Sequence, residues 1–135
     1  MLMILCLSLA VASCSAIDDE NGLNFQRLNV RSVVLPDTLI QGHPYRFQVT
    51  YNRPTICHAF GGFDYRSNGN FRDIIVIGAV EEDRVGCDPQ EGITGTADLN
   101  FVTERDDFYV FRFYQGDDED GNPLFLTREI PVLQE

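Results

Sequence analysis

The 135-residue sequence contains no lysine and no tryptophan, so arginine supplies all ten of its basic side chains. They are outnumbered by 21 acidic side chains, which gives a formal net charge of −11 and an isoelectric point near 4.4. A protein of this charge repels the phosphates of nucleic acids, which a nucleic-acid-binding protein has to neutralise. The composition therefore argues against nucleic acid as a partner.

The sequence also lacks several signatures of catalysis and cofactor binding. It has no glycine loop of the kind that holds phosphates, no Gly-x-Ser-x-Gly nucleophile elbow and no paired Cys/His spacing typical of zinc sites. Carboxylates cluster in Glu81-Glu82-Asp83 and Asp106-Asp107, but acidic residues between predicted strands are usually solvated turn residues. We expect a protein that is not an enzyme and that needs no cofactor and no metal.

No segment repeats apolar residues with the 3.6-residue period of an amphipathic helix. Apolar and polar residues alternate instead, most clearly from Tyr45 to Tyr51, which is typical of a half-buried strand. The other predicted strands are Leu28 to Leu35, Ile74 to Val80, Ala97 to Phe101, Phe108 to Tyr114 and Leu124 to Val132.

These strands predict an all-β domain over residues 25–135. The fold we expect is an antiparallel immunoglobulin-like β-sandwich of six to eight strands, with a small closed barrel as the alternative. We expect Ile74 to Val80 to be covered on both faces, because it is almost continuously apolar. Tyr109, Phe111 and Phe113 are expected to share one buried face.

Residues 1–12 are almost wholly apolar, and the first charged side chain is that of Asp18. The run is too short for a membrane-spanning helix, which needs about 20 apolar residues, but it suits the apolar region of a secretory signal. It ends in Val11-Ala12-Ser13-Cys14. This motif resembles the lipobox of bacterial lipoproteins, in which an aliphatic residue and two small residues precede a cysteine.

The resemblance implies that a peptidase removes residues 1–13 as a signal peptide and that Cys14 carries the fatty acyl chains, palmitate among them. Two or three such chains would hold the protein stably on a membrane. The basic residues that usually begin such signals are missing here. An ordinary secretory signal, or a buried N-terminal strand with an incidental cysteine, remains the alternative.

Residues 14–24 are expected to form a tether, since the segment after Cys14 is polar and contains Asp18-Asp19-Glu20. An acidic run after a lipidated cysteine resembles the surface-export signal of Bacteroidetes lipoproteins. That resemblance implies a lipid-anchored protein of the bacterial outer membrane, facing the periplasm or the cell surface. A plain flexible spacer is the alternative.

Once Cys6 and Cys14 are assigned to the signal and the anchor, only Cys57 and Cys87 remain. In an exported protein such a pair most often forms a disulfide, which we predict here. The alternatives are two free thiols, or metal binding that involves His58.

The longest segment without a predicted strand runs from residue 52 to residue 72. Its Asn68-Gly69 pair favours a tight turn, so a hairpin over residues 58–72 is expected. Loops displayed by a rigid scaffold commonly carry function. The candidate ligand contacts are four aromatic residues of this segment: Phe60, Phe63, Tyr65 and Phe71. Alternatively, the rings cap the open end of the domain.

Residues 117–122, Asp-Asp-Glu-Asp-Gly-Asn, look at first like a calcium-binding loop. With Gly121 in the glycine position, Gly116 and Thr127 fall where that motif needs acidic ligands, so the match fails. We expect a hairpin tip. The surrounding segment, residues 109–132, resembles the closing hairpin of small Bacteroidetes lipoproteins, which implies a single immunoglobulin-like domain.

The expected function is that of a binding or scaffold module that contacts an unknown protein or small ligand through its loops. One alternative is a protease inhibitor of the chagasin type, because Asn52-Arg53-Pro54-Thr55 follows a strand as the first inhibitory loop does in that family. The other is an accessory protein of a hydrolase.

Overall fold

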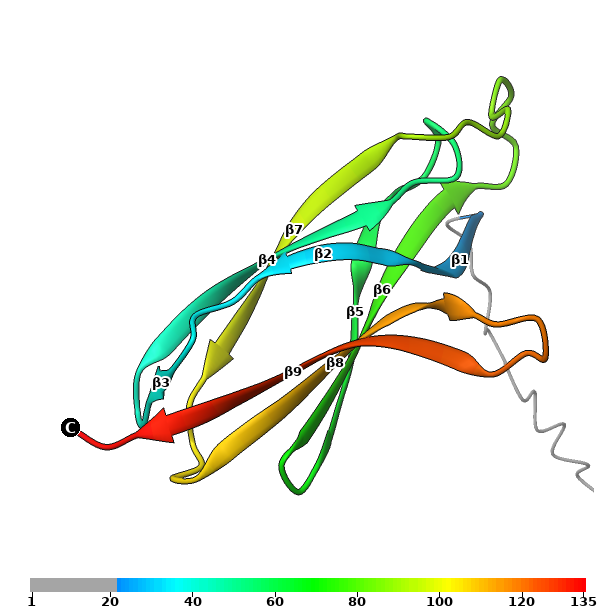
Figure 1. Ribbon diagram of the computed structural model, residues 1–135. Helices are drawn as coiled ribbons and strands as arrows, with labels where there is room; N and C mark the ends of the chain where they lie inside the picture. The colour runs from blue at the N-terminus through cyan, green and yellow to red at the C-terminus, as the bar shows by residue number, and fades with distance from the viewer. Residues whose placement is uncertain (1–21) are drawn as a thin grey trace, which may run out of the picture.

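The computed structural model describes residues 22–135, which form nine strands in two sheets (Figure 1). The predicted signal peptide, Cys14 and the tether up to residue 21 lie outside the described residues. The strands are β1 (Leu23–Leu28), β2 (Val30–Val34), β3 (Leu39–Ile40), β4 (Pro44–Asn52), β5 (Ala59–Asn68), β6 (Phe71–Glu81), β7 (Thr94–Val102), β8 (Phe108–Asp117) and β9 (Pro123–Leu133). In this range no helix is long and apolar enough to cross a membrane.

The two sheets make a β-sandwich-like fold, so the all-β prediction is confirmed. The larger sheet has the order β1-β6-β8-β9-β3 with β5 paired to β6, and the smaller has the order β2-β4-β7. The fold differs from the prediction in two ways: there are nine strands, and the pairs β6–β8 and β3–β9 are parallel. The pair β6–β8 is parallel because β7, between them in sequence, crosses to the smaller sheet before the chain returns.

The predicted first strand is divided between the two sheets. A corner at Asn29 separates β1, which pairs with β6, from β2, which pairs with β4. Leu28 and Val30, on either side of this corner, are both buried. Because β1 starts at Leu23, residues 23 and 24 belong to the domain, although the sequence analysis assigns them to the tether.

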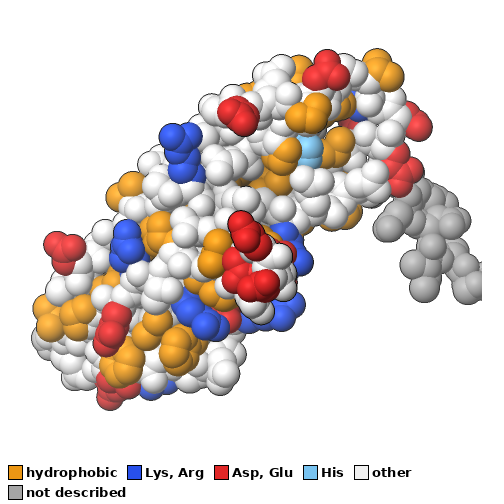
Figure 2. Space-filling model, turned by 45° about the vertical axis from the view of Figure 1, so that its right-hand side comes forward, with side chains coloured by type: hydrophobic (Ala, Val, Ile, Leu, Met, Phe, Trp, Pro, Cys, Tyr) orange, Lys and Arg blue, Asp and Glu red, His pale blue; other side chains and the backbone are white. Residues whose placement is uncertain are grey.

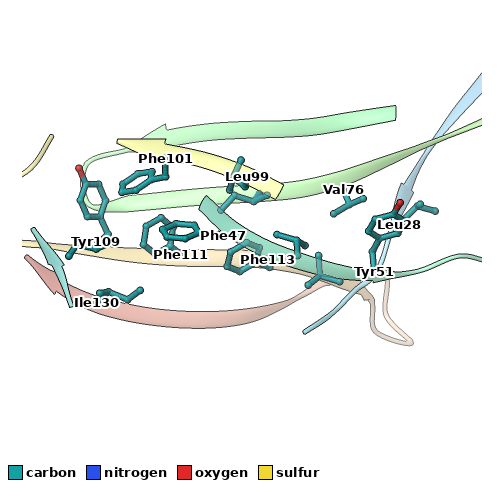
Figure 3. Packing of buried hydrophobic residues seen from close by; sticks show 14 of the residues in the cluster. Leu28, Phe47, Tyr51, Val76, Leu99, Phe101, Tyr109, Phe111, Phe113 and Ile130 are labelled. Atoms are coloured by element: carbon teal, nitrogen blue, oxygen red, sulfur yellow. The ribbon is translucent and has the colours of Figure 1, made fainter. Parts of the chain in front are cut away.

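The core lies between the sheets and is dominated by aromatic rings (Figure 3). Tyr109, Phe111 and Phe113 are fully buried, which confirms the face predicted for β8. The ring of Phe111 meets those of Phe47 and Phe101 at centroid distances of 5.2 and 5.1 Å, close to perpendicular. This edge-to-face geometry is the arrangement that aromatic pairs prefer.

The prediction that β6 is covered on both faces is wrong. Ile74 and Val76 are fully buried, whereas Ile75 and Ile77 on the opposite face are only partly buried. Within its sheet β6 has neighbours on both sides, β5 on one side and β1 and β8 on the other. Its outer face, however, has no second layer among the described residues. The continuous apolar run therefore reflects the central position of β6 in the sheet and not burial of both its faces. Leu124 of β9 is likewise exposed.

Candidate functional site

The four aromatic residues proposed as ligand contacts lie on strands. Phe60, Phe63 and Tyr65 belong to β5 and Phe71 begins β6, so the expectation of a long irregular segment is wrong from Ala59 onward. The predicted hairpin is confirmed, with Gly69 at its turn in a left-handed conformation, φ 59°. Its strands, β5 and β6, are longer than the short hairpin expected from the sequence, and β5 forms an exposed edge of the sheet.

The four rings do not form one surface. Phe60 and Phe63 are in contact, with centroids 4.9 Å apart, and Phe63 packs against the core. Tyr65 lies on the same inner face, because it pairs with Ile74. Phe71 lies on the outer face of the sheet, under the guanidinium of Arg112 at 5.1 Å.

A cavity of about 520 Å³ lies at the end of the domain where β4 ends and β7 begins. Three segments that are far apart in the sequence line it: residues 27–29, residues 52–54 and residues 90–93. Of these three segments, the sequence had drawn attention as a functional loop only to residues 52–54, in the comparison with protease inhibitors. No local pattern identifies the cavity, because its walls meet only in the folded chain.

Backbone hydrogen bonds join the three segments that line this cavity. The N–H of Asn52 donates to the carbonyl of Asn29 at 2.9 Å, and the N–H of Arg53 donates to the carbonyl of Ile93 at 2.8 Å. The N–H of Gln90 donates to the carbonyl of Pro54 at 2.9 Å. The cavity walls are therefore fixed relative to one another.

A disulfide joins Cys57 and Cys87, as predicted, with 5.5 Å between their Cα atoms. It connects the loop that follows β6 to the loop that follows β4. Arg53 braces the same loop: its Nε and Nη2 donate to the carbonyls of His58 and Ile56, each at 2.7 Å. The arginine therefore fixes the conformation of residues 53–58, and the disulfide holds them against the loop that follows β6.

A buried polar pair completes this loop. The hydroxyl of Thr55 lies 2.7 Å from Nδ1 of His58 and accepts a hydrogen bond from the N–H of Cys57. Burial, helped by the charge of Arg53, lowers the pKa of His58. Nε2 of His58 has no hydrogen-bond partner among the described residues. The histidine is therefore neutral at physiological pH and serves to pack the loop.

Polar residues make up much of the cavity's lining although the protein as a whole is acidic. They are two arginines, two asparagines, one glutamine and one glutamate: Arg27, Arg53, Asn29, Asn52, Gln90 and Glu91. The guanidinium of Arg27 lies 5.0 Å over the ring of Tyr114. Tyr114 does not line the cavity, and within residues 22–135 no hydrogen bond or ion pair engages the guanidinium of Arg27.

No protein-family model matches this chain, and no curated protein or solved structure is similar to it. No function is therefore carried over from a relative.

The carboxylates noted in the sequence have structural roles or lie in solvent. Asp107 accepts two hydrogen bonds from Arg105, each at 2.8 Å, and one from the N–H of Phe108. The paired guanidinium holds the pKa of Asp107 well below its ordinary range. Glu81, Glu82 and Asp83 are exposed. A carboxylate held like Asp107 is a weak base, which makes it unsuited to accept a proton from a substrate.

The acidic segment after β8 is a hairpin tip, as predicted. A side-chain oxygen of Asp118 accepts hydrogen bonds from the N–H groups of Asp120 and Asn122, both at 2.9 Å. Gly121 supplies the left-handed residue of the turn, φ 82°. Over residues 22–135, no group of three or more His, Cys, Asp or Glu side chains is placed to hold a metal ion.

On the face drawn in Figure 2, acidic and basic side chains interrupt the apolar ones.

Proposed function

We propose that this chain is a lipid-anchored, non-enzymatic binding module of the bacterial envelope, with an immunoglobulin-like domain that holds a small ligand in the cavity between its loops. The observation on which the proposal depends is the cavity itself, about 520 Å³ and built from three segments that hydrogen bonds fix in place. Ligand sites are commonly preformed hollows of this size, with a few polar groups that orient the ligand.

The polar groups of the cavity indicate the class of ligand. Guanidinium groups form their strongest hydrogen bonds with carboxylates, and amide groups suit hydroxyls. Arg53 already donates two of its N–H groups to the loop, so Arg27 is the main candidate for a carboxylate. Together with the asparagines of the lining, it favours a ligand that carries a carboxylate and several hydroxyls, such as an acidic sugar. Glu91 adds an acceptor for hydroxyl hydrogens.

The lipid anchor is supported by Val11-Ala12-Ser13-Cys14 and by the acidic residues that follow it. Where the described chain begins, the carbonyl of Gly22 accepts a hydrogen bond from the N–H of Glu82 at 2.7 Å. The tether therefore enters the domain close to the loop that follows β6. Seven residues lie between Cys14 and Gly22. The eight Cα-to-Cα steps from Cys14 to Gly22 allow a reach of at most about 28 Å from the membrane surface.

The immunoglobulin-like class remains part of the proposal. Two facing sheets, a chain that crosses repeatedly between them, and loops gathered at the two ends all support it. The protease-inhibitor alternative finds less support, because Thr55 is buried and its hydroxyl is already hydrogen-bonded within the loop. A residue placed in this way is not available to enter a protease cleft.

Mass spectrometry of the protein isolated from membranes of its native host tests the anchor. We expect an N-terminal peptide that begins at Cys14 and carries two or three acyl chains, because fewer would hold the protein only marginally. A peptide that retains Met1, or an unmodified thiol at Cys14, would contradict the anchor. Either result would leave the cavity and its ligand class untouched.

Digalacturonate, with maltose as its uncharged counterpart, tests the ligand class by calorimetric titration of the full chain in detergent. We expect digalacturonate to bind and maltose to bind much more weakly. Arg27→Ala should weaken digalacturonate binding about tenfold, since it removes a charge-assisted hydrogen bond. The matched control is Arg46→Ala, which removes the same charge from an exposed position outside the cavity. Equal affinity of wild type and Arg27→Ala would refute the assignment.

A further inference from the structure

Strand β5 is an unprotected edge of the larger sheet. Its ten residues form a ladder with β6 on one side and with no described strand on the other. Edge strands are usually blunted by proline, lysine or bulges, because their free N–H and carbonyl groups invite another strand to pair. β5 contains no proline, and its one bulge lies between Phe60 and Gly62. Its two charged residues, Asp64 and Arg66, have opposite signs, so they do not repel every partner strand. Residues 63–68 are therefore regular and open.

The turn that follows β5 determines which backbone groups point outward. Gly69 and Asn70 form a two-residue loop, so the flanking residues Asn68 and Phe71 bond to each other. Alternation along the strand then directs the N–H and carbonyl groups of Phe63, Tyr65 and Ser67 away from β6. The hydrogen bond from the N–H of Val110 in β8 to the carbonyl of Asn70 supports this assignment. It indicates that the backbone groups of even-numbered residues in β6 point toward β8, which leaves those of odd-numbered residues to bond β5.

The two charged residues of β5 are arranged for pairing with a copy of the same strand. Asp64 and Arg66 alternate with the outward-bonding residues, and their side chains are 38% and 73% exposed. Within one chain they form an exposed ion pair at 3.1 Å, which a dimer would exchange for pairs between the two copies. We propose that two copies of this chain pair through β5, antiparallel, with the two-fold axis at Tyr65. Asp64 of each copy then lies opposite Arg66 of the other. About six backbone hydrogen bonds would form between the outward-bonding residues of the two strands.

The charges select this register over its neighbours. A two-fold axis at residue 64 would place two aspartates opposite each other, and an axis at residue 66 would place two arginines opposite each other. Directly opposed like charges destabilise a strand pair. The edge strands of the smaller sheet, β2 and β7, each carry one charged side chain, Arg31 and Asp98. Because each of these strands has only one charged residue, neither strand can form cross-strand ion pairs with a second copy of itself.

Pairing through β5 would leave the ligand cavity free, because no residue of β5 lines it. The dimer therefore does not depend on the proposed function. Since the two strands run in opposite directions, the two tethers leave from opposite ends of the pair. Both anchors reach one membrane when the paired strands lie along its surface.

Charge-swap variants test the dimer by sedimentation velocity, with the full chain in a large excess of detergent micelles so that chance co-occupancy is rare. We expect wild type to show a concentration-dependent monomer–dimer equilibrium. Asp64→Arg or Arg66→Asp alone should weaken the dimer about tenfold or more, because each places like charges in opposition twice. An equimolar mixture of the two variants should restore a heterodimer, since every opposed pair then has opposite signs.

The controls separate pairing from net charge and from misfolding. Asp98→Arg and Arg46→Asp change the charge by the same amounts in an ion pair of the smaller sheet, and both should dimerise like wild type. If net charge governed association, Asp64→Arg would strengthen the dimer, because it lowers the repulsion between two acidic chains. Circular dichroism confirms that each variant is folded. Wild type that stays monomeric, single variants that dimerise normally, or folded variants that do not associate when mixed would each overturn the proposal.

Discussion

Replacing Phe111 with alanine is expected to lower the free energy of unfolding by about 3 to 5 kcal/mol. The side chain is fully buried, and its ring contacts those of Phe47, Phe101 and Tyr109. Truncation would remove these contacts and leave a cavity that rigid strands from both sheets cannot close. Domains are stable by only about 5 to 15 kcal/mol, so the change takes away a large part of the total.

Urea denaturation followed by far-ultraviolet circular dichroism measures this loss, since the chain has no tryptophan to report by fluorescence. The control is Phe25→Ala, the same substitution at a β1 side chain that is 58% exposed. There we expect a change within about 0.5 kcal/mol, as for most surface positions. If the two variants lost similar stability, the aromatic cluster would not be the centre of the fold.

The core was predictable where strands alternate strictly. Along Tyr45 to Tyr51 every second side chain is apolar, and along Tyr109 to Phe113 every second side chain is aromatic. Those side chains are the ones that face the opposite sheet. Burial on one face imposes this period, so the sequence contains it directly. The division at Asn29 was not predictable in the same way, because apolar residues continue on both sides of the corner.

The sequence indicated a short hairpin over residues 58–72, but the full length of β5 was not predicted, for a physical reason. The bulge between Phe60 and Gly62 inserts one extra residue, so Phe60 and Phe63 face the same side although they are three positions apart. This spacing breaks the period of two. The strand is also exposed at the edge of the sheet, where burial does not require apolar residues at alternate positions. An edge strand with a bulge therefore lacks the alternating pattern from which strands are predicted.

The cavity could not be predicted, because its walls depend on pairings that a single sequence does not show. Residues 27–29 meet residues 52–54 through β2 and β4, and both meet residues 90–93 through the start of β7. The disulfide was the exception. With two cysteines left in the expected domain, only one pairing within the chain was available, and that pairing fixed the approximate position of the loop after β6.

Replacing both Cys57 and Cys87 with serine is expected to lower the free energy of unfolding by about 3 to 4 kcal/mol, mainly because the unfolded chain regains the entropy of a loop that the bond had closed. The bond joins residues 30 positions apart. Its effect should extend to the cavity, since Gln90 follows Cys87 by three residues and lines the wall. Digalacturonate binding should therefore weaken even below the temperature at which the variant unfolds.

Reduction of the wild-type protein provides the matched measurement for this variant. Urea denaturation with excess reductant should move the wild-type midpoint to that of the double-serine variant, and reductant should leave the variant unchanged. The reduced protein should remain folded without denaturant, because the aromatic cluster around Phe111 includes neither cysteine. A midpoint that did not change on reduction would mean that the bond adds no stability, and the loops at the cavity would then be held by Arg53 and the backbone hydrogen bonds alone.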